Sequence, residues 1–533
     1  MPVARPLLAR AASTPLPTAR GAAYARAPVQ DFGPIDAAAK AARAPLAVDL
    51  ALALGLMAAG AALRLACFSG FGLGDDANLL FFVRSILRDA VVPPDNIAYR
   101  FTWWLPAVLA CRLFGLTERA LILPFVVVDT LGIGLVYALG RKLCGRCGGV
   151  VGALLVIATP LDFAWATMMT NDLFVSFFSA LALLCALAAL DAKDARWRSV
   201  AWAGAAVSLW LGAHAKFSAL LMVPVVLFAA WRKRRRLDRR TWTLAATAAV
   251  LFGASAIVSY ALAGDPIAPY HVELAAEGLK RPDAPVIHPL RASEFWTWLD
   301  TLFRPDYLGD RLFSFQPHVL VALAVAAPLL GLRVPLELVA WLAVVMLGLQ
   351  FHSIRLTDGG WVMGFRNVRH AHALVYPMAL LLAALACGLR ARFGRWVDAA
   401  VVVLVGIGLW QSVSTSSKTR IGFADQRAAC RLLATLPVKP VHCDFHLALW
   451  SRLLDLKNPF HELAPVAEQR EPEMASLHGY VVTGGAREPR YGCLLCVPLS
   501  AELPAGPRRL LLEVTGPAPT WWRPEPLRVW ELE

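Results

Sequence analysis

The chain has 533 residues, of which 58% are hydrophobic and only 17% are charged. One water-soluble core cannot bury that many apolar residues, so the composition excludes an ordinary soluble domain and predicts an integral membrane protein. The net charge of +14 does not indicate nucleic-acid binding, because the basic residues follow the orientation pattern of a membrane protein.

Apolar stretches long enough to form membrane-spanning helices lie between residues 45 and 413. Nine of them are 45–68, 119–140, 148–165, 172–190, 241–263, 316–332, 335–351, 370–389 and 397–413. Residues 199–230 are apolar as well, but Gly212, His214 and Lys216 interrupt them, which allows either two short spans or one bent span. Two spans are favoured, since only then do all the basic clusters fall on one side. The predicted total is eleven.

Lys and Arg collect in short loops on the cytoplasmic side of a membrane protein. The basic clusters of this chain are at 141–146, 193–198, 232–240 and 390–395. They share one side with the tail over residues 1–44, which has six basic residues and two acids. The sequence therefore predicts a disordered cytoplasmic tail over 1–44, a transmembrane domain over 45–413 that begins with a retained anchor, and an exterior C-terminus.

On this threading the exterior holds the loops 69–118, 264–315 and 352–369 and the residues from 414 onwards. Short apolar runs separated by turn signals predict a small α/β domain over residues 414–533. Its expected strands are 440–445, 479–483, 493–499, 509–514 and 527–532. Four cysteines lie in this domain, Cys430, Cys443, Cys493 and Cys496. They are buried or paired in disulfides, or they form a less favoured metal site with His442 or His446.

Two adjacent carboxylates, Asp75 and Asp76, follow the first span in the exterior loop. Alone they would be read as the solvated start of a loop. Residues 78–89, however, have apolar positions at helical spacing, as in an interfacial helix that lies along the bilayer. Such a helix would hold the two carboxylates at the membrane surface. Asp162, at the end of the third span, and Asp172, at the start of the fourth, add acids to the same face.

Several cations on the predicted exterior run against the charge rule, which indicates an anionic partner. They are Lys216, Arg355, Arg366, Arg369, His370 and His372. Arg matches phosphate oxygens with two parallel hydrogen bonds, and Lys supplies a point charge. Lipid headgroups or loop acids could bind each cation singly. As a set, the cations predict a phosphate site at the membrane surface.

Carboxylates beside a phosphate site suit the transfer of a group from a lipid phosphate to a hydroxyl or an amine. A phosphate departs without being protonated, so a single base suffices, and it deprotonates the acceptor. The cations stabilise the charge that accumulates on the departing phosphate.

These residues resemble motifs of the GT-C superfamily, membrane glycosyltransferases that use polyprenyl-phosphate sugars. The branch of protein mannosyltransferases and aminoarabinose transferases looks closest. The similar segments are the acidic first-loop motif at 74–79, the entry to the second span at 113–124, the second exterior acid at Asn171-Asp172 and the basic segment at 366–377. The chain departs from the family pattern at Asp76, where Glu is common, and at His370, where Tyr is frequent.

The resemblance implies a role for each matching residue. Asp75 would be the base or a metal-facing carboxylate with Asp76 as its partner, and Asp172 would contact the acceptor or a divalent cation shared with Asp75. The donor phosphate would be bound by Lys216, Arg366, Arg369 and His370. The implied partners are a polyprenyl-phosphate-linked sugar, membrane lipids and an acceptor that is a lipid, a glycan or a protein. Transfer would occur on the exterior, periplasmic face of a bacterial inner membrane.

Two other functions stay open on the sequence. A transporter or flippase for a lipid-linked saccharide would also carry basic residues at the interface. It needs polar groups near the bilayer midplane, where Asp129 is the clear candidate in this chain. A non-catalytic membrane assembly protein on the same scaffold is the third alternative. Release of the lipid phosphate from a polyprenyl-phosphate sugar distinguishes the transferase from both.

Overall fold

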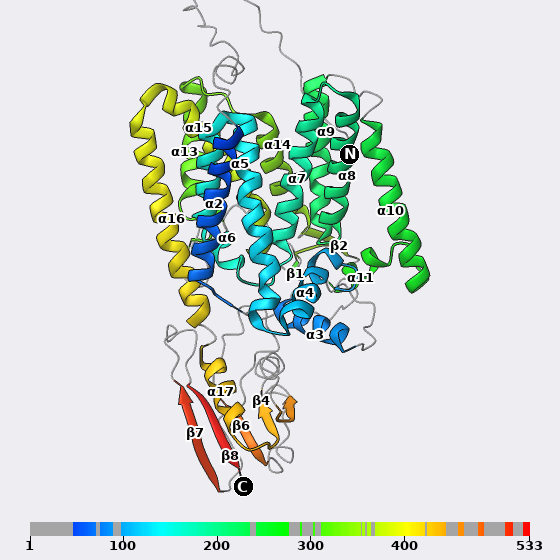
Figure 1. Cartoon of the computed structure of the whole chain (residues 1–533), viewed down its shortest axis with the longest axis vertical. Coiled ribbons are helices and arrows are strands. Elements are labelled where there is room, and N and C mark those ends of the chain that lie inside the picture. The colour runs from blue at the N-terminus through cyan, green and yellow to red at the C-terminus, as the bar shows by residue number, and fades with distance from the viewer. Residues whose placement is uncertain are drawn as a thin grey trace, which may run out of the picture. The chain divides into compact units, whose positions relative to one another are not determined.

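The computed structural model is mostly helical, with two small sheets (Figure 1). It describes residues 46–70, 75–88, 97–234, 241–276, 288–289, 302–303, 311–352, 354–357, 360–363, 368–421, 424–443, 457–462, 478–483, 507–514 and 526–532. The predicted tail over residues 1–44 lies outside these ranges. So does most of the predicted exterior loop 264–315.

Helices occupy every apolar stretch that the sequence predicts to span the membrane. They are α2 (Leu46–Ala66), α5 (Glu118–Ile157), α7 (Asp172–Asp191), α8 (Ala195–Ala213), α9 (Met222–Arg234), α10 (Trp242–Ala263), α13 (Gln316–Leu329), α14 (Leu336–His352), α15 (Val375–Phe393) and α16 (Arg395–Ile421). Within the described residues, six helical segments are long and apolar enough to cross a bilayer. The chain is therefore a multi-pass membrane protein, and the count of eleven crossings and the orientation stay predictions.

The long helix α5 contains the second predicted span and most of the third. Its backbone leaves the helical conformation at Gly145, where φ is 78°, so two helices meet there at a turn. The third span was predicted to reach residue 165 but ends at Ile157, because Pro160 lacks the N–H that would continue the helix. Pro160 instead begins the separate short helix α6 (Pro160–Trp165).

The interruption predicted within residues 199–230 is present. Helix α8 ends at Ala213, and the 3-10 helix η1 (Phe217–Leu221) separates it from α9. The stretch thus forms two helices, as the basic clusters favoured, and Lys216 stands at the break between them.

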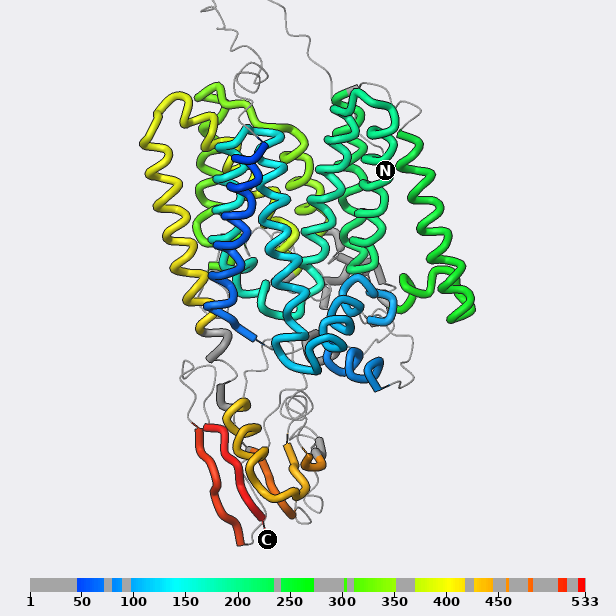
Figure 2. Tube along the Cα trace, in the orientation of Figure 1, coloured from blue at the N-terminus to red at the C-terminus, as the bar shows by residue number. Residues whose placement is uncertain are grey.

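Burial divides the long helices into an inner and an outer set. The most apolar 18 residues of α5, α7 and the span ending with α15 are 61%, 67% and 78% buried, whereas those of α2, α10 and α16 are each only 11% buried. The outer helices expose large apolar side chains, among them Ile257 of α10 and Trp410 of α16. An apolar surface of this extent suits lipid and not water. Figure 2 shows α10 running along α8, and α16 following α15.

A network of fully buried polar side chains lies among the inner helices. Arg64 of α2 forms ion pairs with Asp129 of α5 and, at 2.6 Å between Nη2 and Oδ2, with Asp162 of α6. His372 Nε2 lies 2.9 Å from Asp162 Oδ1, and its Nδ1 lies 2.8 Å from the Ser176 hydroxyl of α7. Charges removed from solvent are tolerated only with close partners of opposite sign, so these contacts fix the mutual positions of the segments that carry them.

The predicted first exterior loop contains two helices, α3 (Asp75–Leu87) and α4 (Phe101–Phe114). The later segments predicted to be exterior meet in a three-stranded antiparallel sheet of order β1-β3-β2, formed by β1 (His288–Pro289), β2 (Ile354–Thr357) and β3 (Gly360–Met363). Helix α11 (Ala268–Ala276) follows α10. The loops predicted at 264–315 and 352–369 are thus joined by backbone hydrogen bonds.

The C-terminal residues form helix α17 (Ala424–Thr435) and a five-stranded mixed sheet of order β5-β4-β6-β8-β7. The strands are β4 (Val441–Cys443), β5 (Phe460–Glu462), β6 (Gly479–Thr483), β7 (Arg508–Val514) and β8 (Leu527–Leu532). Strand β4 is parallel to β5 and β6, and β8 is antiparallel to β6 and β7. Four of the five predicted strands lie where the sequence places them. The fifth, at 493–499, lies outside the described residues, and β5 was not predicted.

Two of the four cysteines of this region lie within the described residues. Cys430 of α17 and Cys443 of β4 are both buried. Cys493 and Cys496 lie outside the described residues, so the disulfides stay a prediction.

The buried network makes a prediction about stability. Arg64→Met leaves two carboxylates without the Arg64 charge, and breaking a buried ion pair costs about 3–5 kcal/mol. We expect a clearly lower apparent melting temperature in detergent. The variant that also carries Asp129→Asn and Asp162→Asn should melt at a higher temperature than Arg64→Met alone, because it buries no uncompensated charge. Equal melting of Arg64→Met and the parent protein would contradict the role given to the network.

Candidate active site

Helix α3, which begins at the predicted catalytic acids, packs into one apolar cluster with the first turns of α7. The cluster contains Leu79 and Val83 of α3, Phe125 of α5, Phe174 of α7 and Ala219 of η1. Asp75 and Asp76 form the first turn of α3. Their side chains lie outside the described residues, so their roles stay predictions. The helix that carries them shares this apolar cluster with the first turns of α7 and packs against α4.

Asp172 and Lys216, predicted separately as an acceptor contact and a phosphate ligand, form an ion pair in the structure. Lys216 Nζ lies 2.9 Å from Asp172 Oδ1, and both residues are buried. The neighbouring Asn171 donates to the carbonyl oxygen of Ala215 at 3.3 Å. These contacts join the first turn of α7 to the break between α8 and α9. The sequence did not predict that the two residues contact each other.

The ion pair changes how each residue can bind a ligand. The charge of Lys216 is balanced by Asp172, so a phosphate at Lys216 would share the ammonium with that carboxylate. Asp172 likewise could join a metal site only together with other acids. Within the part of the chain that the structure describes, no group of three His, Cys, Asp or Glu side chains could hold a metal ion. The side chain of Asp75 is not among those residues, so the predicted cation site is untested.

A narrow crevice adjoins the ion pair. Its lining includes Lys216, Arg100, Tyr99, His214 and Phe217. The crevice holds only about 10 Å³, the space of about one water molecule, so it accommodates a single oxygen-sized group and not a sugar ring. Two cationic side chains thus line one small space at the start of α4.

The position of Arg100 follows from the way α4 docks on the end of α8. The Thr102 hydroxyl donates to the carbonyl oxygen of Leu211 at 3.0 Å, and the centroids of the Phe101 and His214 rings are 4.7 Å apart. His214 Nδ1 donates to the carbonyl oxygen of Tyr99 at 3.1 Å. The backbone on both sides of Arg100 is therefore held against α8. Sequence reasoning missed Arg100, although a basic residue in a predicted exterior loop was the signal used for the other cations.

An acid lies near the same crevice. His271 Nδ1 is 2.6 Å from Asp265 Oδ2, and the backbone N–H of Ile267 donates to Oδ1 of the same carboxylate at 3.0 Å. These hydrogen bonds lower the pKa of Asp265, which therefore stays ionised at neutral pH. Burial and the charge of Asp265 raise the pKa of Tyr99, so the phenol stays protonated.

The last predicted group of cations stands on the 3-10 helix η3 (Val368–Leu374). His370 is half-buried. Arg366 and the side chain of Arg369 lie outside the described residues. Helix η3 is held to α7 by the hydrogen bond between His372 and Ser176, one turn after Asp172 on the same helix. The segment carrying Arg369 and His370 is thus attached next to the Asp172 end of α7.

Two expectations for surface residues are corrected. Asp162 was expected among the exterior acids and His372 among the exterior cations. Both are fully buried, and they contact each other in the Arg64 network. Asp129, the acid predicted to lie deep in the membrane, is in the same network. Arg64 was overlooked, although a charged residue inside an apolar span is itself a signal of a buried partner.

Glu118, from the predicted motif at the entry to the second span, contacts the C-terminal region. It begins α5, with the Thr117 hydroxyl capping the helix by accepting from the N–H of Ala120. Arg427 Nη2 of α17 lies 3.0 Å from Glu118 Oε1 and 3.4 Å from the carbonyl oxygen of Ser69. The first loop is therefore tied at its beginning and its end to α17.

Comparison with known proteins gives three findings. Residues 101–260 match the family model described as dolichyl-phosphate-mannose-protein mannosyltransferase. The fold is similar to the crystal structure of ArnT from Cupriavidus metallidurans bound to undecaprenyl phosphate, with 13% identity and a TM-score of 0.51 over 91% of this chain and 97% of that one. The family match covers less than a third of the chain and the structural similarity is one of fold, and both agree with the resemblance to the GT-C superfamily. No curated protein sequence matches the chain.

Two further solved structures are similar at lower scores. The oligosaccharyltransferase of Archaeoglobus fulgidus in complex with Zn and sulfate has 11% identity and a TM-score of 0.48 over 80% of this chain and 68% of that one. The mycobacterial arabinofuranosyltransferase AftD has 15% identity and a TM-score of 0.46 over 89% of this chain and 40% of that one. The segment that matches the family model contains Asp172 and Lys216 and ends before η3.

The ion pair at the start of α7 generates a second prediction. Lys216→Met should lower stability by about 3–5 kcal/mol, because the buried Asp172 loses the Lys216 charge. Adding Asp172→Asn should recover part of the loss. The measurement is the fraction of protein that stays monodisperse in size-exclusion chromatography after stepwise heating. A Lys216→Met protein that tolerates heat as well as the parent would mean that the pair does not stabilise the fold.

Proposed function

We propose that the protein is a GT-C-type glycosyltransferase that transfers a sugar from a polyprenyl-phosphate donor to an acceptor at the exterior face of the membrane. The observation that carries the proposal is the ion pair between Asp172, in the first turn of α7, and Lys216, at the break between α8 and α9. Helix η3, which carries His370, is hydrogen-bonded to α7 one turn further along. Helix α3, which begins at Asp75, supports the proposal through the apolar cluster that it shares with Phe174 of α7.

The relatives support the class of donor. The ArnT structure contains undecaprenyl phosphate, and the matching family model describes a transferase that uses dolichyl-phosphate mannose. Both are polyprenyl phosphates. We assign the donor phosphate to Lys216, Arg366, Arg369 and His370, as the sequence predicted, and add Arg100, which lines the same crevice as Lys216. The sugar and the acceptor, whether lipid, glycan or protein, are not assigned.

The proposed step uses one base and one cationic site. Asp75 takes the proton of the acceptor hydroxyl or amine as the acceptor atom bonds to the anomeric carbon of the donor. The bond between that carbon and the phosphate oxygen breaks, and its electron pair leaves with the phosphate. The basic side chains stabilise the charge on that oxygen. We assign Asp172, which is held by Lys216, to orienting the acceptor or to a cation site with Asp75.

Transport of a lipid-linked saccharide is the alternative from another class. It would use charged groups deep in the bundle, and Arg64, Asp129, Asp162 and His372 are such groups. They contact one another inside the fold with no exposed surface, which favours a structural role.

Purified protein in detergent, given a radiolabelled polyprenyl-phosphate sugar and a membrane extract as acceptor source, should release polyprenyl phosphate. A protein that only moves the donor across a bilayer would leave it intact.

The role of the first-loop acids gives a third prediction. Asp75→Asn should lower the rate of donor cleavage about 100- to 10,000-fold, since an amide cannot accept the proton. Expression and detergent extraction should be unchanged. Asp398→Asn, which removes an exposed carboxylate in the first turn of α16, is the matched control and should retain turnover. Turnover of Asp75→Asn near that of the parent would remove Asp75 from the mechanism.

The cations of η3 give a fourth prediction. Arg369→Ala should weaken binding of a polyprenyl-phosphate sugar more than binding of a neutral polyprenol. A charge-assisted hydrogen bond contributes roughly 1.5–3 kcal/mol, or about one to two decades in affinity. Arg369→Lys should recover only part, because an ammonium keeps the charge and loses the planar fork.

The two Arg369 variants can also contradict the assignment of the donor phosphate to Arg369. Should both bind the donor as tightly as the parent in a pull-down with labelled lipid, Arg369 would serve packing. Binding of the donor phosphate would then be assigned to Lys216, Arg100 or Arg366.

A further inference from the structure

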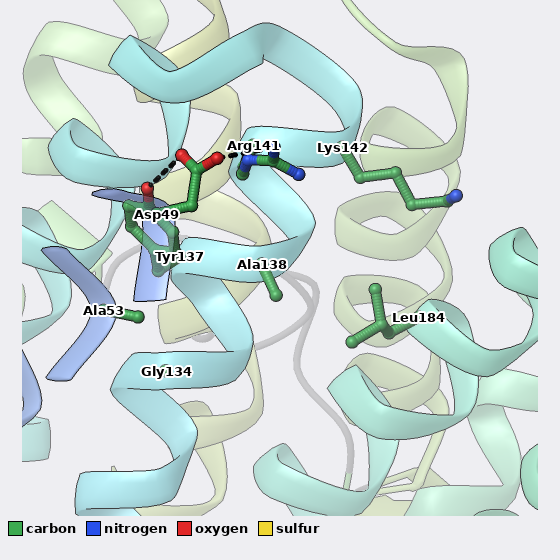
Figure 3. Close-up of a pocket in the computed structure, with 8 residues that line it drawn as sticks. All are labelled: Asp49, Ala53, Gly134, Tyr137, Ala138, Arg141, Lys142 and Leu184. Atoms are coloured by element: carbon green, nitrogen blue, oxygen red, sulfur yellow. Dashed lines mark hydrogen bonds and ion pairs between the residues drawn. The ribbon is translucent and has the colours of Figure 1, made fainter. Parts of the chain in front are cut away.

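A second cavity lies at the other end of the helices that carry the candidate site. It has a volume of about 370 Å³, and Figure 3 shows eight residues that line it. The walls are small or apolar and come from three helices, Ala53 of α2, Gly134 and Ala138 of α5, and Leu184 of α7. Its volume falls at the lower end of the range of about 300–1,000 Å³ that is usual for small-molecule sites.

The mouth of this cavity is polar and carries net positive charge. Asp49 accepts a hydrogen bond from Tyr137 at 2.9 Å and forms ion pairs with Arg141 and Arg146. Lys142 extends on the side of the cavity away from Asp49, as Figure 3 shows.

Beyond the mouth, Asp191 forms ion pairs with Lys142 and Lys233. Four cations therefore share the two carboxylates Asp49 and Asp191, and this group has an excess of two positive charges. An anion at the mouth would balance that excess.

The cavity lies far from the candidate active site. Asp172 begins α7 and Asp191 ends it, and the helix is 20 residues long. At 1.5 Å per residue the two ends are about 30 Å apart, the thickness of the hydrocarbon core. The cavity mouth therefore lies at the opposite membrane face, where it is no part of the donor site.

We propose that this cavity binds an anionic glycerophospholipid of the leaflet opposite the candidate active site. The apolar walls between α2, α5 and α7 would take the upper part of an acyl chain. Arg141 and Lys142 would contact the phosphate, Arg with two parallel hydrogen bonds and Lys as a point charge. A polar cavity rim above an apolar interior matches the two chemical halves of such a lipid, and a free phosphate would use only the rim.

The test compares lipids retained by the purified protein. Protein in nanodiscs of phosphatidylcholine and phosphatidylglycerol in equal parts is released and examined by native mass spectrometry. The parent should retain phosphatidylglycerol in preference to phosphatidylcholine. The double variant Arg141→Ala/Lys142→Ala should lose about 25-fold of that preference, since each basic residue near an anionic surface contributes roughly fivefold. Arg141→Lys/Lys142→Arg keeps both charges and should keep most of it.

Two further variants separate this site from general surface charge. Lys193 follows the end of α7, and Arg196 lies in the first turn of α8. Both are exposed cations, and neither lines the cavity. Their double Ala variant should retain the lipid as the parent does. Ala138→Leu fills the cavity and leaves every charge in place, so it should reduce retained phosphatidylglycerol severalfold.

Three outcomes would overturn the proposal. They are equal retention of both lipids by the parent, a loss in the Lys193/Arg196 variant as large as in the Arg141/Lys142 variant, and unchanged retention in Ala138→Leu. Free phosphate competing away the retained lipid from the parent would also assign the rim to a soluble anion. None of these outcomes bears on donor cleavage.

Discussion

The structure depends on the neutralisation of charge in a medium without water. Arg64 is fully buried, and two carboxylates from different segments, Asp129 and Asp162, supply the opposite charge. Because a buried charge without a partner is strongly unfavourable, α2, α5 and α6 can pack together in few ways. Apolar packing alone is less directional, since lipid competes with each helix face for the same contacts.

That network extends to the candidate active site through hydrogen bonds. His372 contacts Asp162 with one ring nitrogen and the Ser176 hydroxyl with the other, and so it fastens η3 to α7. One turn towards the start of α7, Asp172 meets Lys216 at the break between α8 and α9. A structural cluster and a chemical site therefore follow one another along a single helix, and displacing η3 would move the cations that we assign to the donor.

The two ends of α7 differ in the way they use charge. At its start, acids and bases from distant segments pair closely around a narrow crevice, which suits a reaction that needs oriented groups. At its end, Asp191 shares a surface with several cations, which suits attraction of a lipid headgroup. Between these ends the helix is apolar and mostly buried. A single helix thus carries, at its two ends, two groups of charges that are paired in different ways.

The sequence by itself determined the local features. Apolar runs fixed the helices, the polar residues before Lys216 marked the break in 199–230, and short runs after 424 located most strands of the second sheet, because each depends on neighbours along the chain. The tertiary structure decided the pairings. Residues far apart in the sequence come together in the Asp172–Lys216 ion pair, around the buried His372 and at Arg100. A pattern of neighbouring residues does not indicate which distant residues will come into contact. Side chains that looked like exterior charges were partners inside the fold, because burial is a property of the packed bundle.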